Sequence, residues 1–352
     1  MSRGDIKIIL TACGCPGAAT LIRMLQELPD RKISIVGTDI DDEAVGKFLV
    51  DRFYKVPHGR SEEYIPTMLS IVEKELPDVL LPESSDEIKQ LSEHKQKFRE
   101  YGAEILVSDS DVSKLTDNKY RMYEYLSQNA QISLPEFYIA RSHRDFHKAA
   151  AKLGYPEKPI VIKPPVGKGS RGVRIIDSEI NQKNLILKEK PDTLYMSIEE
   201  FDHVFTTGEF PELLVMEYLN GEEVTADSVC LQGKELLTTF KTVEKARCGV
   251  ITRGELVERP NLMKATREIL NAIPLSYCIN VQFIDGKLVE INPRVSTFIF
   301  QRDFLLVDLA IRLAMGEITE EVISNYQYNI DYGRRMVRYM DQVFHNDGRR
   351  VL

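Results

Sequence analysis

One short segment carries three polar side chains whose types and spacing could do chemistry. Glu290, Asn292 and Arg294 occupy alternate positions in "LVEINPRV", and in an extended strand such residues point to one face. Carboxylate and amide oxygens are ligands for Mg²⁺, and a fixed cation can stabilise a transferred phosphoryl group. The triplet therefore indicates phosphoryl chemistry. The alternative is a salt-bridged sheet face in which Arg294 simply pairs with Glu290.

A further oxygen ligand is expected from the strand before this triplet, because "INVQFIDGKLVEIN" reads as a β-hairpin. A three-residue turn, "DGK", would place Gln282 opposite Glu290 on the same face, whereas a two-residue turn would place it on the other face. With the longer turn, Gln282, Glu290 and Asn292 are the predicted magnesium ligands.

A glycine-rich segment, "IVIKPPVGKGSRGV", is the second candidate. Lys163 ends an apolar, β-branched strand, so its ammonium should project from a rigid element. The loop after it can expose backbone N–H groups to a polyphosphate; its members are Gly167, Lys168, Gly169, Ser170, Arg171 and Gly172. The pattern is not the P-loop motif, and a mobile basic hairpin is the alternative.

A third candidate is "GCPGAA", between the first strand and the first helix, where Gly14 and Gly17 could form an anion site. Asp39 ends the second strand, where a ribose-binding acid would lie in a dinucleotide fold. An NAD(P)-dependent oxidoreductase is therefore one hypothesis. Because the motif is not G-x-G-x-x-G, glycines required only for tight packing are the simpler explanation.

Two regions must position these residues. Residues 1–112 alternate strand-like segments ("KIILTACG", "KISIVGTD", "PDVLLPES", "GAEILVSD") with helical ones, which predicts a parallel sheet covered by helices, an open Rossmann-like α/β lobe. The character then changes to a mixed α+β region. From residue 316 to 352 the chain is charged and rich in tyrosine, and we treat it as a C-terminal extension.

Composition limits the possible functions. The chain has 352 residues, 43% apolar and 28% charged, which suits a soluble protein of two or three lobes. Its net charge of −8 argues against nucleic-acid binding. No apolar run reaches the length of a membrane span and the start is no signal peptide, so we expect a cytoplasmic protein. Five scattered cysteines suggest reduced thiols.

Taken together, the motifs resemble the ATP-grasp superfamily, most closely one unit of the carbamoyl-phosphate synthase large chain. "VEINPRVST" is similar to that family's metal-binding segment, and "IVIKPPVGKGSRGV" to its lysine and phosphate-covering loop. "VMEYLNGEEV" resembles the adenine hinge, and "DNKYRMYEYL" the helix that opens the nucleotide-binding half. The resemblance implies a pre-ATP-grasp domain at 1–112 and an ATP-grasp domain at 113–315, with a small lid at about 155–222 and a mixed α+β C-terminal subdomain.

The resemblance also implies ATP with Mg²⁺, or Mn²⁺ in its place, and assigns contacts by position. Lys163 and Arg294 become the catalytic residues, Arg294 at the γ-phosphate or an acyl phosphate. The other implied contacts are Lys119 and Lys163 to the phosphates, the loop Gly167 to Gly172 over the β- and γ-phosphates, Glu217 and Leu219 to adenine, Glu223 to ribose, and Gln282, Glu290 and Asn292 to the metal.

The chain has room for one ATP-grasp unit, whereas the synthase has two. We therefore expect a carboxylate–amine ligase that acts through an acyl phosphate on small molecules. Substrate contacts are expected from Gly14, Gly17 and Arg294, and from Arg253, which reads as a loop residue in "GVITRGEL". Besides the oxidoreductase, two alternatives stay open: a carbamoyl-phosphate-synthase-like kinase of a small carboxylate, and a non-catalytic nucleotide-binding regulator. A homodimer also stays open.

Overall fold

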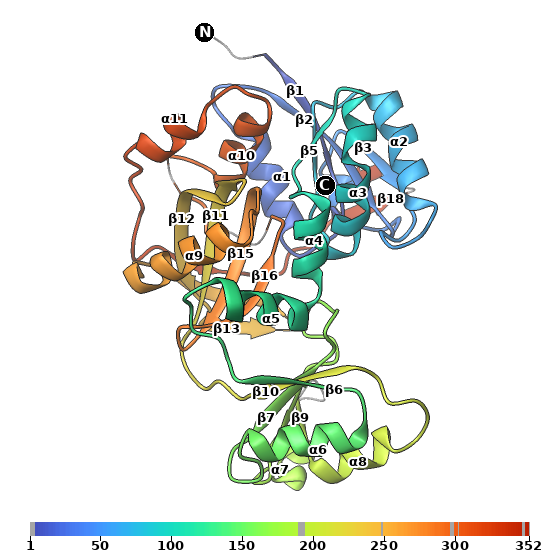
Figure 1. Ribbon diagram of the computed structural model, residues 1–352. Coiled ribbons are helices and arrows are strands. Elements are labelled where there is room, and N and C mark those ends of the chain that lie inside the picture. The colour runs from blue at the N-terminus through green and yellow to red at the C-terminus, as the bar shows by residue number, and fades with distance from the viewer. Residues whose placement is uncertain are drawn as a thin grey trace.

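The computed structural model describes residues 4–188, 194–247, 249–295, 299–301, 303–346 and 349–351. An N-terminal α/β lobe and a mixed α+β region pack side by side, and a smaller lid lies at one end of the molecule (Figure 1). Among the described residues, no helix has both the length and the apolar character needed to cross a membrane.

The N-terminal lobe is a five-stranded parallel sheet in the order β3-β2-β1-β4-β5, as predicted from the alternating pattern. Its strands are β1 (Ile6–Leu10), β2 (Ile33–Asp39), β3 (Arg52–Lys55), β4 (Val79–Leu81) and β5 (Glu104–Ile105). Its helical elements are α1 (Ala18–Gln26), η1 (Val45–Phe48), α2 (Tyr64–Glu75) and α3 (Ser85–Arg99). Apolar residues of α1 pack on one sheet face and those of α2 and α3 on the other, which fixes the carboxyl ends of the strands as an open edge.

Two helices, α4 (Ser110–Asp117) and α5 (Lys119–Asn129), lead into the lid. The lid sheet has the order β6-β10-β7-β8-β9. Its strands are β6 (Phe137–Ala140), β7 (Ile160–Lys163), β8 (Arg174–Ile176), β9 (Tyr195–Met196) and β10 (Leu213–Glu217), and its helices are α6 (His143–Lys152), α7 (Gln182–Lys188) and α8 (Ile198–Phe205). Because β6 and α6 precede residue 155, the lid sheet reaches further toward the N-terminus than the expected range of 155–222.

The third part is a mixed region around a sheet in the order β13-β14-β12-β11-β15-β16, with β17 paired to β14. Its strands are β11 (Glu223–Leu231), β12 (Lys234–Thr242), β13 (Lys245–Arg247), β14 (Val250–Val257), β15 (Tyr277–Ile284), β16 (Lys287–Asn292) and β17 (Arg335–Val337). Its helices are α9 (Pro260–Ala272), α10 (Leu306–Ala314) and α11 (Glu320–Asn325). A short hairpin, β18 (Phe344–Asn346) and β19 (Arg349–Val351), ends the described chain.

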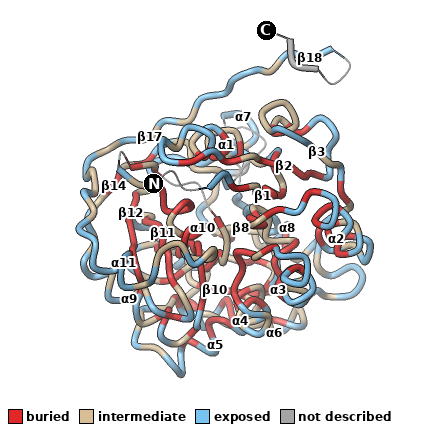
Figure 2. Tube along the Cα trace, turned by 90° about the horizontal axis from the view of Figure 1, so that it is seen from above, coloured by how far each residue is buried: buried red, intermediate tan, exposed pale blue. Residues whose placement is uncertain are grey.

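One hydrophobic core joins the N-terminal lobe to the mixed region. Ile8 and Leu21 of the first lobe share a buried cluster with Tyr277 of β15 and with Val307 and Ile311 of α10. Figure 2 shows the central strands buried, whereas the segment that leads to β18 is exposed. The two lobes are therefore one packed body, and this packing presents the edge of the first sheet to the β15–β16 hairpin.

Candidate functional site

The turn between β15 and β16 differs from the predicted one. Ile284 pairs with Lys287, so the loop is the two residues Asp285 and Gly286 and not three. Both have positive φ, 50° and 73°, which is the conformation that a two-residue hairpin turn requires and that Asp-Gly favours. On its own, this turn would place Gln282 on the wrong face.

A β-bulge restores the predicted pairing. The register shifts by one residue, so Gln282 lies opposite Glu290 and Val289 is the extra residue on β16. The Val289 carbonyl accepts hydrogen bonds from Tyr123 Oη at 2.5 Å and Lys163 Nζ at 3.4 Å. The expected pair is therefore present for a different reason: the bulge, and not a longer turn.

Two lysines and Glu290 form the charged centre of the site. Lys119 Nζ lies 2.9 Å from Glu290 Oε1 and donates a 2.6 Å hydrogen bond to the carbonyl of Gly167. The partner of Glu290 is therefore Lys119 and not Arg294, so the simple Arg294–Glu290 pair is wrong. Burial lowers the pKa of Lys163 to about 8, and the charge of Lys119 acts in the same direction while Glu290 opposes it.

A buried amide lies behind the predicted metal ligands. Asn280, opposite Asn292 on β15, accepts through Oδ1 from Gln282 Nε2 at 3.4 Å and Asn292 Nδ2 at 3.5 Å. Its own Nδ2 donates to Asp227 Oδ1 at 2.8 Å. Because both amides give their N–H groups to Asn280, their oxygens stay free to bind a cation. Sequence reasoning missed Asn280, although it lies two residues before Gln282 on the same face.

A cavity of about 270 Å³ lies between the lid strands and the hairpin. Most of the residues expected to contact the nucleotide line it: Lys119, Lys163, Gly167, Lys168, Gly169, Ser170, Glu217, Leu219, Glu223, Gln282 and Glu290. Gly172 instead lines the second cavity described below, and Asn292 lines a small recess that adjoins Glu290. The structure thus brings most of the predicted nucleotide residues to one cavity.

The far end of this cavity is built by β10 and the start of β11. The N–H of Glu217 donates to the carbonyl of Glu136 at 3.0 Å, and its carboxylate pairs with Lys287 at 2.5 Å. Of the backbone groups that Glu217 and Leu219 were expected to present to adenine, the N–H of Glu217 is therefore already engaged. Burial raises the pKa of Glu223, whose side chain also faces this cavity.

The glycine loop between β7 and β8 reaches across to the first lobe. Lys168 pairs with Asp86 and donates a 3.1 Å hydrogen bond to Ser84 Oγ. Asp86 also contacts Arg60 at 2.9 Å and His58 at 3.2 Å. Burial opposes ionisation of Asp86, but Lys168 and Arg60 outweigh it and lower its pKa. The loop is therefore held by a cluster of charges at the mouth of a second cavity.

This second cavity measures about 910 Å³ and lies between the loop and the carboxyl edge of the first sheet. Arg294 opens into it and is held by hydrogen bonds to Ser85 Oγ at 2.9 Å and to the carbonyl of Val295 at 2.8 Å. Gly14 lines it, whereas Gly17 does not and instead caps α1. Gly167, Lys168, Arg171 and Pro164 line both cavities.

Glu83 lines the second cavity, and its pKa is shifted far from the ordinary value of a glutamate. Burial raises its pKa to about 7, although a 2.5 Å hydrogen bond from Cys15 Sγ and the charge of Arg294 act in the opposite direction. From the sequence, Glu83 is only the second-last residue of the strand-like segment "PDVLLPES". The protonation behaviour depends on burial between lobes and could not be seen in the sequence.

The structure supports the packing explanation of the N-terminal motif and corrects the expectation for Arg253. Asp39 accepts hydrogen bonds from the N–H groups of Gly14 at 2.8 Å and Asp41 at 2.9 Å, and a Cβ at Gly14 would lie 2.9 Å from that of Ala44. Tight packing thus explains this motif without a dinucleotide. Arg253 lies on β14 and not in a loop; it is exposed and lines neither cavity, so it is not placed with the substrate site.

Comparison with known proteins agrees with this geometry. Residues 8–106 match the family model "PylC-like, N-terminal domain", and residues 209–332 match "ATP-grasp in the biosynthetic pathway with Ter operon". No curated protein matches the chain.

Solved structures with the same fold cover most of the chain. An N5-carboxyaminoimidazole synthetase from Staphylococcus aureus, complexed with ADP, is 16% identical at a TM-score of 0.63, over 88% of this chain and 77% of that one. A biotin carboxylase from Campylobacter jejuni is 15% identical at a TM-score of 0.61, over 90% and 73%. A biotin carboxylase domain from Hydrogenobacter thermophilus, complexed with MgADP, is 16% identical at 0.61, over 88% and 70%. The chain therefore has an ATP-grasp fold, its residues 8–106 being similar to PylC-like N-terminal domains and its residues 209–332 to an ATP-grasp family.

Proposed function

We propose that this protein is an ATP- and Mg²⁺-dependent ligase that joins a small carboxylate to an amine through an acyl phosphate. The observation that carries the proposal is the pair of cavities that share the glycine loop. Lys119, Lys163 and Glu290 face the first cavity, Arg294 faces the second, and Lys168 and Arg171 line both. A nucleotide in the first and a carboxylate in the second would meet beneath this loop.

The first cavity has the groups that a nucleotide triphosphate needs. Lys119 and Lys163 supply positive charge at buried positions, 8% and 6% exposed, where charge is weakly screened. Gln282, Glu290 and Asn292 would hold Mg²⁺, a donor set of one carboxylate and two amide oxygens that suits a cation completing its shell with phosphate and water. When bound, the ion supplies charge neutralisation at the phosphates.

The second cavity has the groups for the acceptor chemistry. A carboxylate oxygen bonds to the γ-phosphorus while the bond to the bridging oxygen breaks and ADP leaves, with Arg294 neutralising the reacting phosphoryl group. The amine nitrogen then bonds to the acyl carbon and phosphate leaves. Glu83, with a pKa of about 7, is suited to take the proton from the attacking amine.

The comparisons support nucleotide use without identifying the substrates. Of the neighbours with the same fold, the synthetase was crystallised with ADP and the Hydrogenobacter thermophilus carboxylase domain with MgADP. The carboxylate of Asp39 already accepts one backbone N–H at each oxygen, which leaves fewer acceptor sites for a ribose and weakens the oxidoreductase hypothesis. An intact set of metal ligands likewise argues against a silent regulator.

The test is phosphate release across a panel of carboxylates and amines, with hydroxylamine as a trap for any acyl phosphate. We expect ADP formation to require a carboxylate, and hydroxylamine to yield the hydroxamate of that carboxylate. The amine should then convert the same intermediate to an amide detectable by mass spectrometry. Tight binding of NAD(P) in place of Mg-ATP, or a hydroxamate that never forms in any carboxylate-dependent reaction, would overturn the proposal.

A further inference from the structure

A cluster of metal-binding side chains lies in the lid, away from the nucleotide cavity. His143 and His147 are one helical turn apart on α6, and Asp202 faces them from α8. The Nε2 atoms of the two histidines lie 2.8 Å and 2.9 Å from the same oxygen, Asp202 Oδ1. All three ligand atoms lie within 4.8 Å of one another.

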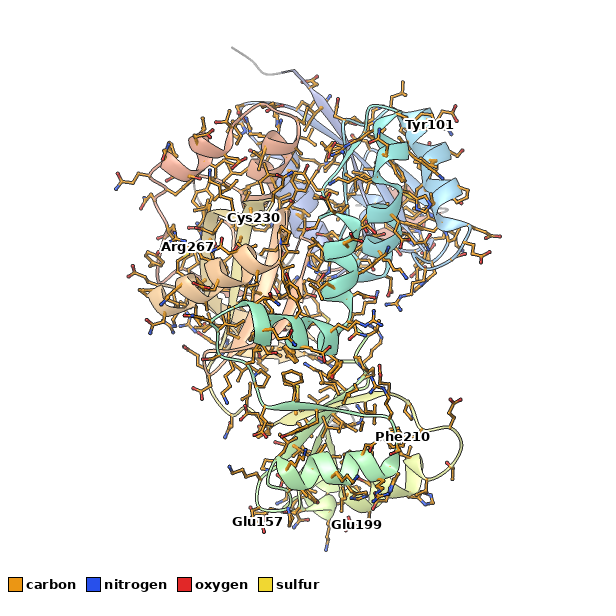
Figure 3. All side chains as sticks on the ribbon, in the orientation of Figure 1. Tyr101, Glu157, Glu199, Phe210, Cys230 and Arg267 are labelled. Carbon is orange, nitrogen blue, oxygen red and sulfur yellow. The ribbon has the colours of Figure 1, made fainter. Side chains whose placement is uncertain are left out.

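Aromatic packing holds the two helices in the register that this cluster needs. Phe146 on α6 and Phe201 on α8 are fully buried, and their stacked rings have centroids 3.7 Å apart. The ring of His147 meets that of Phe146 edge-on, with centroids 5.1 Å apart. The ring of His143 stacks on that of Phe201, with centroids 6.2 Å apart. Phe210, labelled in Figure 3, extends the same group. Because the phenylalanine pair fixes the helices, the three polar side chains are positioned without a metal.

We propose that His143, His147 and Asp202 form a binding site for a divalent transition-metal ion, with Zn²⁺ the best fit. Two imidazoles and one carboxylate are a common zinc donor set, and a fourth position would be open to water. Zinc bonds of about 2.0–2.1 Å in a tetrahedral site place ligand atoms roughly 3.3 Å apart. The two His–Asp separations, 2.8 Å and 2.9 Å, need only a small opening, as the ion replaces the protons that now bridge these atoms.

The site is separate from phosphoryl transfer. None of its three residues lines either cavity, and α6 and α8 lie on the side of the lid turned away from the rest of the protein (Figure 1). A bound ion would cross-link these two helices and make the lid stiffer. Imidazole ligands suit zinc and not magnesium, so the site would not compete with the hard oxygen ligands around Glu290.

The experiment measures binding of Zn²⁺ alone to the tag-free full-length protein by calorimetry, in excess Mg²⁺, with Co²⁺ absorption as a second readout. Asp202→Asn and His147→Gln keep the size of each side chain but weaken or remove a ligand. His203→Gln is the matched control, because His203 is an exposed histidine on the same helix α8. Glu290→Gln reports any zinc held at the nucleotide site.

We expect one ion per chain in the wild type, in His203→Gln and in Glu290→Gln. Loss of a residue that only hydrogen-bonds a metal ligand weakens metal sites by about 10–100-fold. Because Asp202→Asn and His147→Gln change a ligand itself, they should weaken zinc binding by roughly 100-fold or more. The four-coordinate Co²⁺ spectrum should disappear with it. No binding in the wild type, equal binding in all variants, or loss only in Glu290→Gln would each overturn the site.

Discussion

At Lys163, burial and charge act against each other. Its pKa falls to about 8 because burial penalises the ammonium, and Lys119 adds repulsion. Polyphosphate binds the charged form, so the affinity for ATP should be constant below about pH 8. Above that value it should fall, approaching tenfold per pH unit as the neutral amine takes over. Equilibrium titration with ATP between about pH 7 and 9.5 measures this.

The matched variant is Lys163→Arg. A guanidinium keeps its charge throughout this range, so the pH dependence should flatten even where absolute affinity is lower. A profile that is equally steep in both proteins would show that another group controls nucleotide binding.

Glu290 is the anionic member of the proposed metal-ligand set, so Glu290→Gln should nearly abolish ATP turnover while the fold survives. We expect less than about a tenth of wild-type turnover, a barrier increase above ~1.4 kcal/mol. Glu222→Gln is the control, because Glu222 is an exposed rim carboxylate that pairs with Arg259 at 2.7 Å. Steady-state phosphate release compares the two; similar rates would remove Glu290 from the metal site.

Some site residues were predictable from sequence and others were not, for a physical reason. Glu290 and Asn292 follow from strand alternation alone. Asn280 and Tyr123 act through contacts with residues distant in sequence, at 3.5 Å to Asn292 and 2.5 Å to the Val289 carbonyl. Local periodicity identifies a face, but it does not show which groups lie behind that face.

At the scale of elements, the hairpin illustrates the same limit. The Asp-Gly turn was visible, and its two-residue form follows from positive φ at both positions. The bulge at Val289 could not be predicted from the sequence, because hydrogen bonds from α5 and β7 to the displaced carbonyl stabilise it. Likewise Arg253 was read as a loop residue, although pairing of β14 with β13 and β17 makes that segment a strand.

The glycine loop gives the prediction at this scale. Gly172 has φ of +75°, and a Cβ there would lie 2.7 Å from Cδ and Cγ of Pro164. Gly172→Ala should therefore displace the loop. For alanine, unlike glycine, the left-handed conformation alone costs about 1–2 kcal/mol. That corresponds to roughly tenfold weaker ATP binding, with little change in the melting temperature because the loop is at the surface.

Gly167→Ala is the control in the same loop. A Cβ at Gly167 would approach nothing closer than 3.8 Å, and its carbonyl would still accept from Lys119. Calorimetric titration with an ATP analogue compares the two variants. If alanine at position 172 binds the analogue as tightly as the wild type, the closed loop conformation is not the one that binds nucleotide.

For the whole molecule, sequence patterns predicted two lobes and an ATP-grasp order, but not how the lobes meet. The meeting surface combines the core shared by β1, α1 and α10 with buried ion pairs. Arg31, whose side chain is fully buried, contacts Asp308 at 2.5 Å and Glu317 at 3.0 Å; Arg312 contacts the same Asp308 at 2.6 Å. Arg31 lies 277 and 286 positions before Asp308 and Glu317 in the chain, so no local pattern could pair it with them.

Removing Arg31 tests whether this contact holds the body together. Arg31→Ala leaves the buried Asp308 and the partly exposed Glu317 with Arg312 as their remaining cation, and removing one partner of a buried ion pair costs about 3–5 kcal/mol. Because Arg312 still compensates in part, we expect a loss of about 3 kcal/mol in the free energy of unfolding, measured with urea. Arg141→Ala is the control: Arg141 pairs with Glu212 at 2.9 Å, but the two side chains are 64% and 41% exposed, so the loss should stay below about 1 kcal/mol. Equal, small losses of unfolding free energy in both variants would mean that the apolar core alone joins the lobes. The second cavity, which lies between the lobes, would then keep its shape without the ion pairs.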